Sequence, residues 1–139
     1  MKDKIYLTEV GLRDGLQSVA QTVETKDKLF MIDGLIKAGL KNIQVASFVH
    51  PKLVPQMADA ETLIAQLPEI DEVEFSGLVL NQKGVERAIN SGLNKIETSI
   101  STSETHSQKN TRMTLNEAKS NLRGLVTTAK ESGLTVRAG

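Results

Sequence analysis

A signal that ends helices recurs three times in this chain of 139 residues. Gly39, Gly92 and Gly133 each follow a helix-like stretch, and each is followed by a leucine and then a short run rich in β-branched residues. Glycine readily adopts the positive φ that terminates a helix, and the leucine after it can fold back on the last turn. Each copy therefore predicts the end of a helix and the start of a strand.

Strands and helices alternate along the predicted chain. Apolar and β-branched runs predict five strand starts, over 5–9, 43–47, 73–79, 96–100 and 135–137. Helical spacing predicts helices over 26–38, 59–67 and 82–91, and Asn81 is the expected N-cap of the last of these. A further helix opens at Thr114, which forms a capping box with Glu117. This alternation predicts right-handed βαβ units and a parallel sheet covered by helices.

The predicted fold class is α/β, with a parallel sheet that is either part of an eight-stranded (β/α)8 barrel or a smaller open sheet. A closed eight-stranded barrel takes about 250 residues, whereas this chain holds four βα units and the start of a fifth strand. We therefore expect a single domain over residues 1–139 that forms the N-terminal half of a barrel, or else a smaller open sheet. Two long loops, 48–58 and 101–113, follow predicted strands, at the edge where α/β proteins bind ligands.

Charge and composition exclude several classes of function. Seventeen basic and seventeen acidic side chains give a formal charge of zero, so nucleic acid is not an expected partner. The absence of cysteine excludes disulfides and a thiolate metal site within these residues. No apolar run approaches the roughly 18–20 residues of a membrane span, so we expect no membrane partner and a cytoplasmic location.

Three charged residues lie where the first predicted strand ends. Alternation places Glu9 at the end of the apolar row of Ile5 and Leu7, and Arg13 and Asp14 follow in a turn flanked by glycines. An aspartate can bind a hard divalent cation, and an arginine can hold an oxyanion. The alternative interpretation is a surface turn in which Arg13 is the ion-pair partner of Asp14.

The stretch 8–17, TEVGLRDGLQ, closely resembles the opening of 3-hydroxy-3-methylglutaryl-CoA (HMG-CoA) lyases, within a wider group that includes isopropylmalate and homocitrate synthases. The resemblance continues through 46–57, 81–84 and 103–110 and covers essentially the whole chain. The synthases usually carry glutamate where Leu16 stands, so the lyase branch is favoured.

The resemblance implies a TIM barrel in which Asp14 ligates Mg²⁺ or Mn²⁺ and Arg13 neutralises the enolate oxygen as a carbon–carbon bond breaks. The implied substrate is an acyl-CoA, HMG-CoA, which is cleaved to acetoacetate and acetyl-CoA. Glu9 is implied to lie near the metal or to handle a proton, and its alternative role is a salt bridge to Arg13. The family's metal-binding histidines come from the second half of the barrel, so this chain alone is expected to bind metal poorly and to be inactive.

Four more residues are candidates for contacts with the substrate or CoA. Gln17 is expected to brace the turn through its amide, and Gln44 stands where the family typically has glutamate. Lys109 and Asn110 are implied to contact CoA, and their alternative is a solvated loop. Ala20 stands where many lyases carry a basic residue, which removes one candidate CoA contact.

Three further hypotheses follow from this pattern. One is a condensing enzyme that joins acetyl-CoA to a 2-oxo acid, and another is a non-catalytic half-barrel that binds CoA or a partner. The third concerns assembly, because exposed sheet edges in a half-barrel predict self-association or a homodimer. His50 and His106 fall in separate polar loops and are expected to be solvated rather than ligands.

Overall fold

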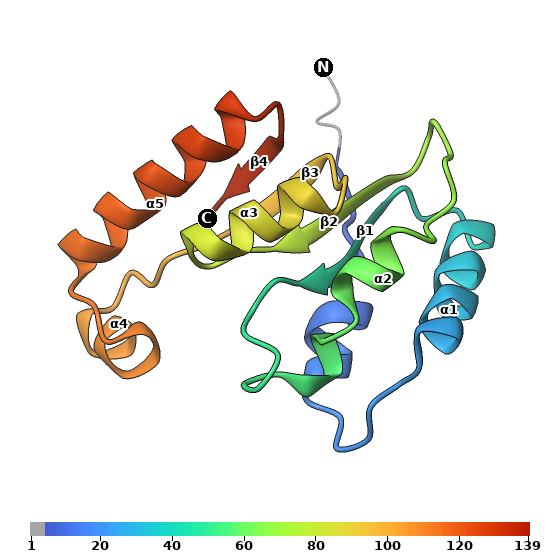
Figure 1. Cartoon of the computed structure of the whole chain (residues 1–139), viewed down its shortest axis with the longest axis horizontal. Helices are drawn as coiled ribbons and strands as arrows, with labels where there is room; N and C mark the ends of the chain where they lie inside the picture. The colour runs from blue at the N-terminus through green and yellow to red at the C-terminus, as the bar shows by residue number, and fades with distance from the viewer. Residues whose placement is uncertain (1–4) are drawn as a thin grey trace.

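The computed structural model describes residues 5–139, which form a parallel sheet of four strands flanked by helices (Figure 1). The strands lie side by side in chain order: β1 (Asn42–Ser47), β2 (Glu74–Leu78), β3 (Lys95–Thr98) and β4 (Thr135–Ala138). The main helices alternate with them: α1 (Thr25–Lys37), α2 (Ala60–Ile64), α3 (Gln82–Asn90) and α5 (Leu115–Glu131). The α/β class and its parallel βα units are therefore confirmed.

The glycine signals act as predicted. Gly39, Gly92 and Gly133 have φ values of 89°, 80° and 83°, in the region that disfavours a Cβ atom. After the first of them, the Leu40 amide donates to the Leu35 carbonyl at 3.1 Å, which closes the last turn of α1. Each helix therefore stops and turns the chain directly into the next strand.

The predicted first strand is largely wrong. Among residues 5–9 only Glu9 pairs with the sheet, through a parallel bridge to Ile43. Its amide donates to the Asn42 carbonyl at 2.9 Å, and its carbonyl accepts from the Gln44 amide at 2.8 Å. Ile5 is 84% exposed, so the apolar alternation that predicted a strand finds no described layer to pack against.

The segment 101–113, predicted as a long loop, contains a helix. Helix α4 (Glu104–Thr111) begins where the Ser103 side chain accepts from the His106 amide at 3.3 Å, and it ends at Arg112 with φ 58°. Local capping by Ser103 therefore supports a helix in a segment that was predicted to be a loop. The other predicted loop, 48–58, holds only the short 3₁₀ turn η2 (Pro55–Met57).

The two faces of the sheet differ sharply. One face packs its apolar side chains against the helices and forms the core. Core members include Ile43, Val45 and Ile96 on the strands, and Ile32, Val85 and Leu125 on the helices. Figure 1 shows α1 and α5 at opposite ends of this helical layer.

The other face is polar and curved. Ser76 donates to Glu97 at 2.7 Å, and Glu97 also accepts from Arg137 at 3.2 Å. Arg137 lies 3.4 Å from the Thr8 hydroxyl, although β4 and the segment containing Thr8 flank opposite sides of the sheet. The sheet must therefore curl around this face, as the wall of a barrel does.

Among residues 5–139, no helix combines the length and the apolar character that a membrane span requires.

Candidate active site

The predicted Arg13 and Asp14 lie on a single π-helical turn, η1 (Gly11–Gly15), that follows Glu9. Leu12 is buried and anchors the turn in the core. The Val10 carbonyl accepts from the amides of Arg13 and Asp14, at 3.1 Å and 2.7 Å. One carbonyl therefore fixes the backbone of both residues, which restricts where their side chains can lie.

The Glu9 side chain stabilises this turn by a hydrogen bond to its backbone. Its Oε1 atom accepts from the Gly11 amide at 2.6 Å, and a Cβ atom at Gly11 would lie 2.8 Å from that oxygen. Glycine at this position lets the carboxylate approach the backbone this closely, and a larger residue would displace it. The alternative salt bridge between Glu9 and Arg13 is wrong, because Asp14 supplies the carboxylate that Arg13 contacts.

Arg13 is held at two of its three nitrogens. Its Nε donates to Gln44 Oε1 at 2.5 Å, and its Nη1 donates to Asp14 Oδ1 at 2.7 Å. Gln44 is a buried residue of β1, so Arg13 leans over the sheet, and its side chain is only 17% exposed. The Asp14 side chain is 59% exposed. The structure thus brings Arg13, Asp14 and Gln44 together, with a fixed guanidinium beside an accessible carboxylate.

Gln17 does not brace the turn as predicted. It is half-buried, and its side chain makes no hydrogen bond within residues 5–139. Ser18 does so instead, because its short side chain donates to the Gly15 carbonyl at 3.0 Å. A serine after a glycine-flanked turn is a recognisable signal for such bonding.

Lys109 and Asn110 lie apart from this turn, on the last turn of α4, and both are exposed. The Asn110 amide is 2.9 Å from His106 Nε2, and His106 is exposed, as predicted. Asn110 and His106 line a cavity of about 980 Å³ with residues that follow β2 and β3, including Asn81 and Ser101. Carboxyl ends of parallel strands share one edge, so this cavity opens at the same edge as Arg13.

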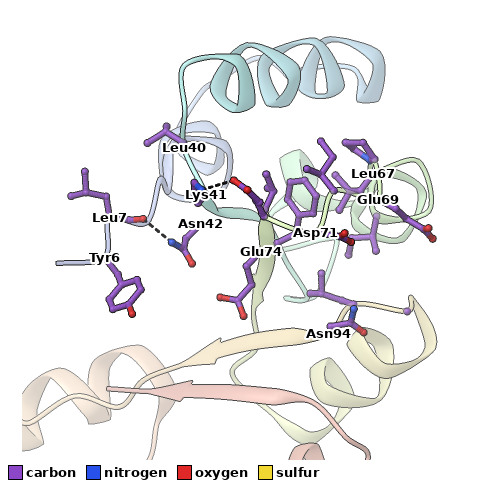
Figure 2. Close-up of a pocket in the computed structure, with 18 of the residues that line it drawn as sticks. Tyr6, Leu7, Leu40, Lys41, Asn42, Leu67, Glu69, Asp71, Glu74 and Asn94 are labelled. Atoms are coloured by element: carbon purple, nitrogen blue, oxygen red, sulfur yellow. Dashed lines mark hydrogen bonds and ion pairs between the residues drawn. The ribbon is translucent and has the colours of Figure 1, made fainter. Parts of the chain in front are cut away.

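The opposite edge of the sheet holds another hollow, of about 1010 Å³ (Figure 2). Its lining includes Lys41, Asn42 and Glu74, at the amino ends of β1 and β2. None of the predicted site residues lines it, and Figure 2 shows Asn42 bonded to Leu7 across its wall. Its size therefore does not make it the reactive site, because the candidate chemistry lies at the other edge.

A complete metal site is not formed by the part of the chain that the structure describes. Residues 5–139 contain no group of three or more His, Cys, Asp or Glu side chains placed to hold a metal ion. Asp14 is one oxygen ligand, whereas Mg²⁺ requires about six donors. The donor set present does not fit a divalent cation without further ligands.

Sequence reasoning missed a buried lysine and a second arginine pair. Lys28 is 1% exposed and donates to Asp59 Oδ1 at 2.5 Å. Its spacing of four residues from the buried Ile32 was the available signal, because such residues share a helix face. Arg87 and Glu61 form a pair between α3 and α2, which the linear sequence does not indicate.

Comparison with known proteins gives this arrangement its context. The family model described as HMGL-like matches residues 4–139. The chain belongs to the HMGL-like family. It is 37% identical over 135 residues to hydroxymethylglutaryl-CoA lyase YngG of Bacillus subtilis, covering 97% of this chain and 45% of that protein. The sequence-based family assignment is thereby confirmed.

Solved structures give the same result for the HMGL-like chain. The hydroxymethylglutaryl-CoA lyase from Pseudomonas aeruginosa superposes with a TM-score of 0.92 at 36% identity, over 97% of this chain and 45% of that one. An HMG-CoA lyase from Acinetobacter baumannii, in complex with coenzyme A and 3-methylmalate, gives 0.87 at 29% identity, over 96% and 43%. These neighbours are TIM barrels, so the curved sheet corresponds to part of a barrel. The chain spans about 45% of the length of such relatives.

Proposed function

We propose that this chain is the N-terminal half of a divalent-metal-dependent carbon–carbon lyase of HMG-CoA lyase type. The observation that carries the proposal is the placement of Arg13, which is fixed by Gln44 beside the exposed carboxylate of Asp14. The family match over residues 4–139 supports the reaction class. Mg²⁺ or Mn²⁺ would need ligands beyond Asp14, so the chain alone is expected to be inactive.

The reaction explains why a fixed guanidinium is useful. In a retro-Claisen cleavage of HMG-CoA, the tertiary hydroxyl loses its proton and becomes the ketone of acetoacetate as the carbon–carbon bond breaks. The electron pair of that bond passes to the acetyl-CoA fragment, where negative charge develops on an enolate oxygen until the carbon is protonated. A guanidinium held beforehand at that oxygen stabilises the charge without reorganising during the reaction. We assign this role to Arg13.

Glu9 has a supporting role in this proposal. Its carboxylate is engaged by the Gly11 amide at 2.6 Å, so it shapes the turn that presents Arg13 and Asp14. Gln17 and Gln44 are proposed to border the substrate, and Gln44 does so while orienting Arg13. Because Gln44 is neutral, it leaves the Asp14 carboxylate as the anionic partner of Arg13.

The CoA portion is proposed to bind along α4. Asn110 lines the cavity at the carboxyl ends of β2 and β3. The exposed Lys109 ammonium beside it could form an ion pair with a phosphate of CoA. A related structure was solved in complex with coenzyme A. Calorimetric titration of CoA into the chain tests this. Lys109→Ala should weaken binding severalfold, whereas Lys119→Ala, an exposed lysine on α5, should not.

The experiment that tests the reaction uses the full-length product of the gene that encodes this chain. We expect it to cleave HMG-CoA to acetoacetate and acetyl-CoA when Mg²⁺ or Mn²⁺ is present, and the 139-residue chain alone to show no cleavage. Condensation of acetyl-CoA with 2-oxo acids, without HMG-CoA cleavage, would instead establish the synthase alternative. Leu16 is the sequence feature that favours the lyase.

Titration of the chain with acetyl-CoA, together with the activity assays, distinguishes a non-catalytic binding module from the lyase and the synthase. Tight acetyl-CoA binding by the chain, together with an absence of lyase and synthase activity in the full-length product, would favour a non-catalytic CoA-binding half-barrel.

We also propose that the isolated chain self-associates. Strand β4 pairs with β3 along one side, and Ile5 and Leu7 are 84% and 70% exposed beyond β1. An open strand edge and uncovered apolar side chains both favour association. Sedimentation analysis should detect dimers or larger species at micromolar concentrations. A stable monomer would contradict this proposal and leave the lyase assignment unaffected.

A further inference from the structure

The segment that leaves the Arg13 and Asp14 turn is held by another part of the fold. Residues 19–24 form no helix or strand, and most of them are exposed. At their start, the Val19 carbonyl accepts from Gln56 Nε2 at 2.7 Å. Gln56 belongs to η2, in the loop after β1, so the segment is tied to a distant part of the sequence.

Gln56 is in turn held by a buried cation. The Lys28 side chain on α1 is 1% exposed, and its Nζ donates to the Gln56 carbonyl at 2.7 Å. The same ammonium donates to Asp59 Oδ1 at 2.5 Å, while the other oxygen of Asp59 accepts from the Thr25 hydroxyl at 2.7 Å. A buried ammonium requires such partners, because unpaired burial of a charge is very costly. Lys28 therefore fixes both Asp59 and the backbone at Gln56.

We infer that Lys28 is a positioning residue for the Arg13 and Asp14 turn, acting through Gln56 and Val19. The contacts form a continuous path, since Val19 closes the end of the turn by donating its amide to the Leu16 carbonyl at 3.1 Å. Lys28 touches neither Arg13 nor Asp14, so its action is indirect. The inference deepens the proposed function and rests on it only for the identity of the site.

Lys28→Met leaves Asp59 without its ammonium partner, but the Asp59 side chain is 25% exposed and keeps the Thr25 hydroxyl, so solvent offsets part of the lost stability. A positioning role and a general stabilising role therefore predict different results for Lys28→Met. If Lys28 positions the turn, local opening of the turn should increase while the core stays protected. If it only stabilises the fold, all protected amides should respond together.

Residue-resolved amide exchange by NMR on the 139-residue chain tests the inference. In Lys28→Met, the amides of Asp14, Ser18 and Val19 should exchange about tenfold faster, because the restraint on local opening is weakened. The core amides of Val45 and Leu125 should be accelerated by a clearly smaller factor than these three. Uniform acceleration of all five, or no change in the first three, would overturn the inference.

Matched variants separate this path from general effects. Lys37→Met removes another lysine of α1, one that forms an exposed pair with Asp33, and should leave the turn unchanged. Gln56→Ala should accelerate the same three amides, and the double variant with Lys28→Met should be no faster than the faster single variant. If the two single variants had additive effects on the exchange rates of these amides, Lys28 and Gln56 would not act through the same contacts.

Should Lys28→Met not fold, the double variant Lys28→Met/Asp59→Leu replaces both charges of the pair with apolar side chains and makes the same prediction. No substrate or metal enters these measurements, so they remain decisive even if the proposed reaction is wrong.

Discussion

Two arginine–carboxylate pairs in this molecule have similar geometry but differ in how many guanidinium nitrogens remain free to bind a ligand. Arg87 directs Nε and Nη2 to the two oxygens of Glu61, at 2.6 Å and 2.9 Å, and Nη1 to the Val49 carbonyl at 2.9 Å. Its guanidinium also lies 5.5 Å from the centre of the Phe48 ring. Every nitrogen of that group is engaged by the fold.

Arg13 is engaged at only two nitrogens. Nε and Nη1 are bonded to Gln44 and Asp14, while Nη2 makes no hydrogen bond within residues 5–139. Its carboxylate partner is 59% exposed, compared with 42% for Glu61. A saturated pair joins helices, whereas a fixed group with a spare donor can bind a ligand. We therefore interpret Arg87 as structural and Arg13 as functional.

The largest effect should come from replacing Arg13. In the full-length protein, Arg13→Met should lower kcat for HMG-CoA cleavage by about 10²–10³-fold, as loss of a charge-stabilising donor does. Arg123→Met, at an exposed position on α5, is the control and should leave kcat unchanged. Equal kcat values for Arg13→Met and the wild type would remove Arg13 from the reaction.

Arg87→Met should affect folding instead. It leaves the Val49 carbonyl and Glu61 without their donor, so the free energy of unfolding of the chain should fall by about 1–2 kcal/mol. Urea denaturation followed by circular dichroism measures this change. Arg13→Met should cost less in the same assay, because only Gln44 Oε1 loses a buried donor and Asp14 remains solvated. A larger loss for Arg13→Met would reverse the comparison.

Gly11→Ala tests how the turn presents Arg13 and Asp14. The added Cβ atom would lie 2.8 Å from Glu9 Oε1, so the carboxylate must move and the turn should lose about 1 kcal/mol of stability. Glu9→Ala combined with Gly11→Ala removes the clash, and the double variant should be less destabilised than the two single effects summed. Strict additivity would show that Glu9 does not shape the turn.

The smallest effect concerns pH. Hydrogen bonding to Arg87 holds the pKa of the Glu61 carboxyl below its usual value of 4.5. Since the unfolded state then binds more protons, this stabilisation is present above about pH 4.5 and is lost as the pH falls through the lowered pKa. Because Glu61 is partly exposed, we expect less than about 1 kcal/mol. The difference in unfolding free energy between wild type and Glu61→Gln should shrink on acidification, and a constant difference would contradict this.

Local signals in the sequence were enough for most of the fold. Gly39, Gly92 and Gly133 predict helix ends because a positive φ depends on the residue itself. The capping box of Thr114 and Glu117 is likewise formed by neighbours three residues apart. The strand predicted over 5–9 failed because pairing depends on what lies beside it, which alternation does not encode.

The site could be predicted in its residues but not in its contacts. Adjacency made the pairing of Arg13 with Asp14 foreseeable, whereas the bond from Arg13 to Gln44 spans 31 positions and depends on how the turn sits over β1. The same holds for Lys28 and Asp59, which are also 31 positions apart. Such contacts arise from tertiary packing, and a single sequence indicates at most that each residue lies on a buried face.

The bond between Arg13 and Gln44 is the most direct test of this account. In ¹H–¹⁵N spectra of the chain, the Arg13 Nε–H group should give a resonance that exchanges slowly with water, and Arg13→Lys assigns it by its disappearance. Gln44→Ala should shift this resonance and accelerate its exchange, while the Nε–H resonance of Arg87 stays in place. An Arg13 resonance with the same position and exchange rate in both proteins would show that Gln44 does not hold the guanidinium.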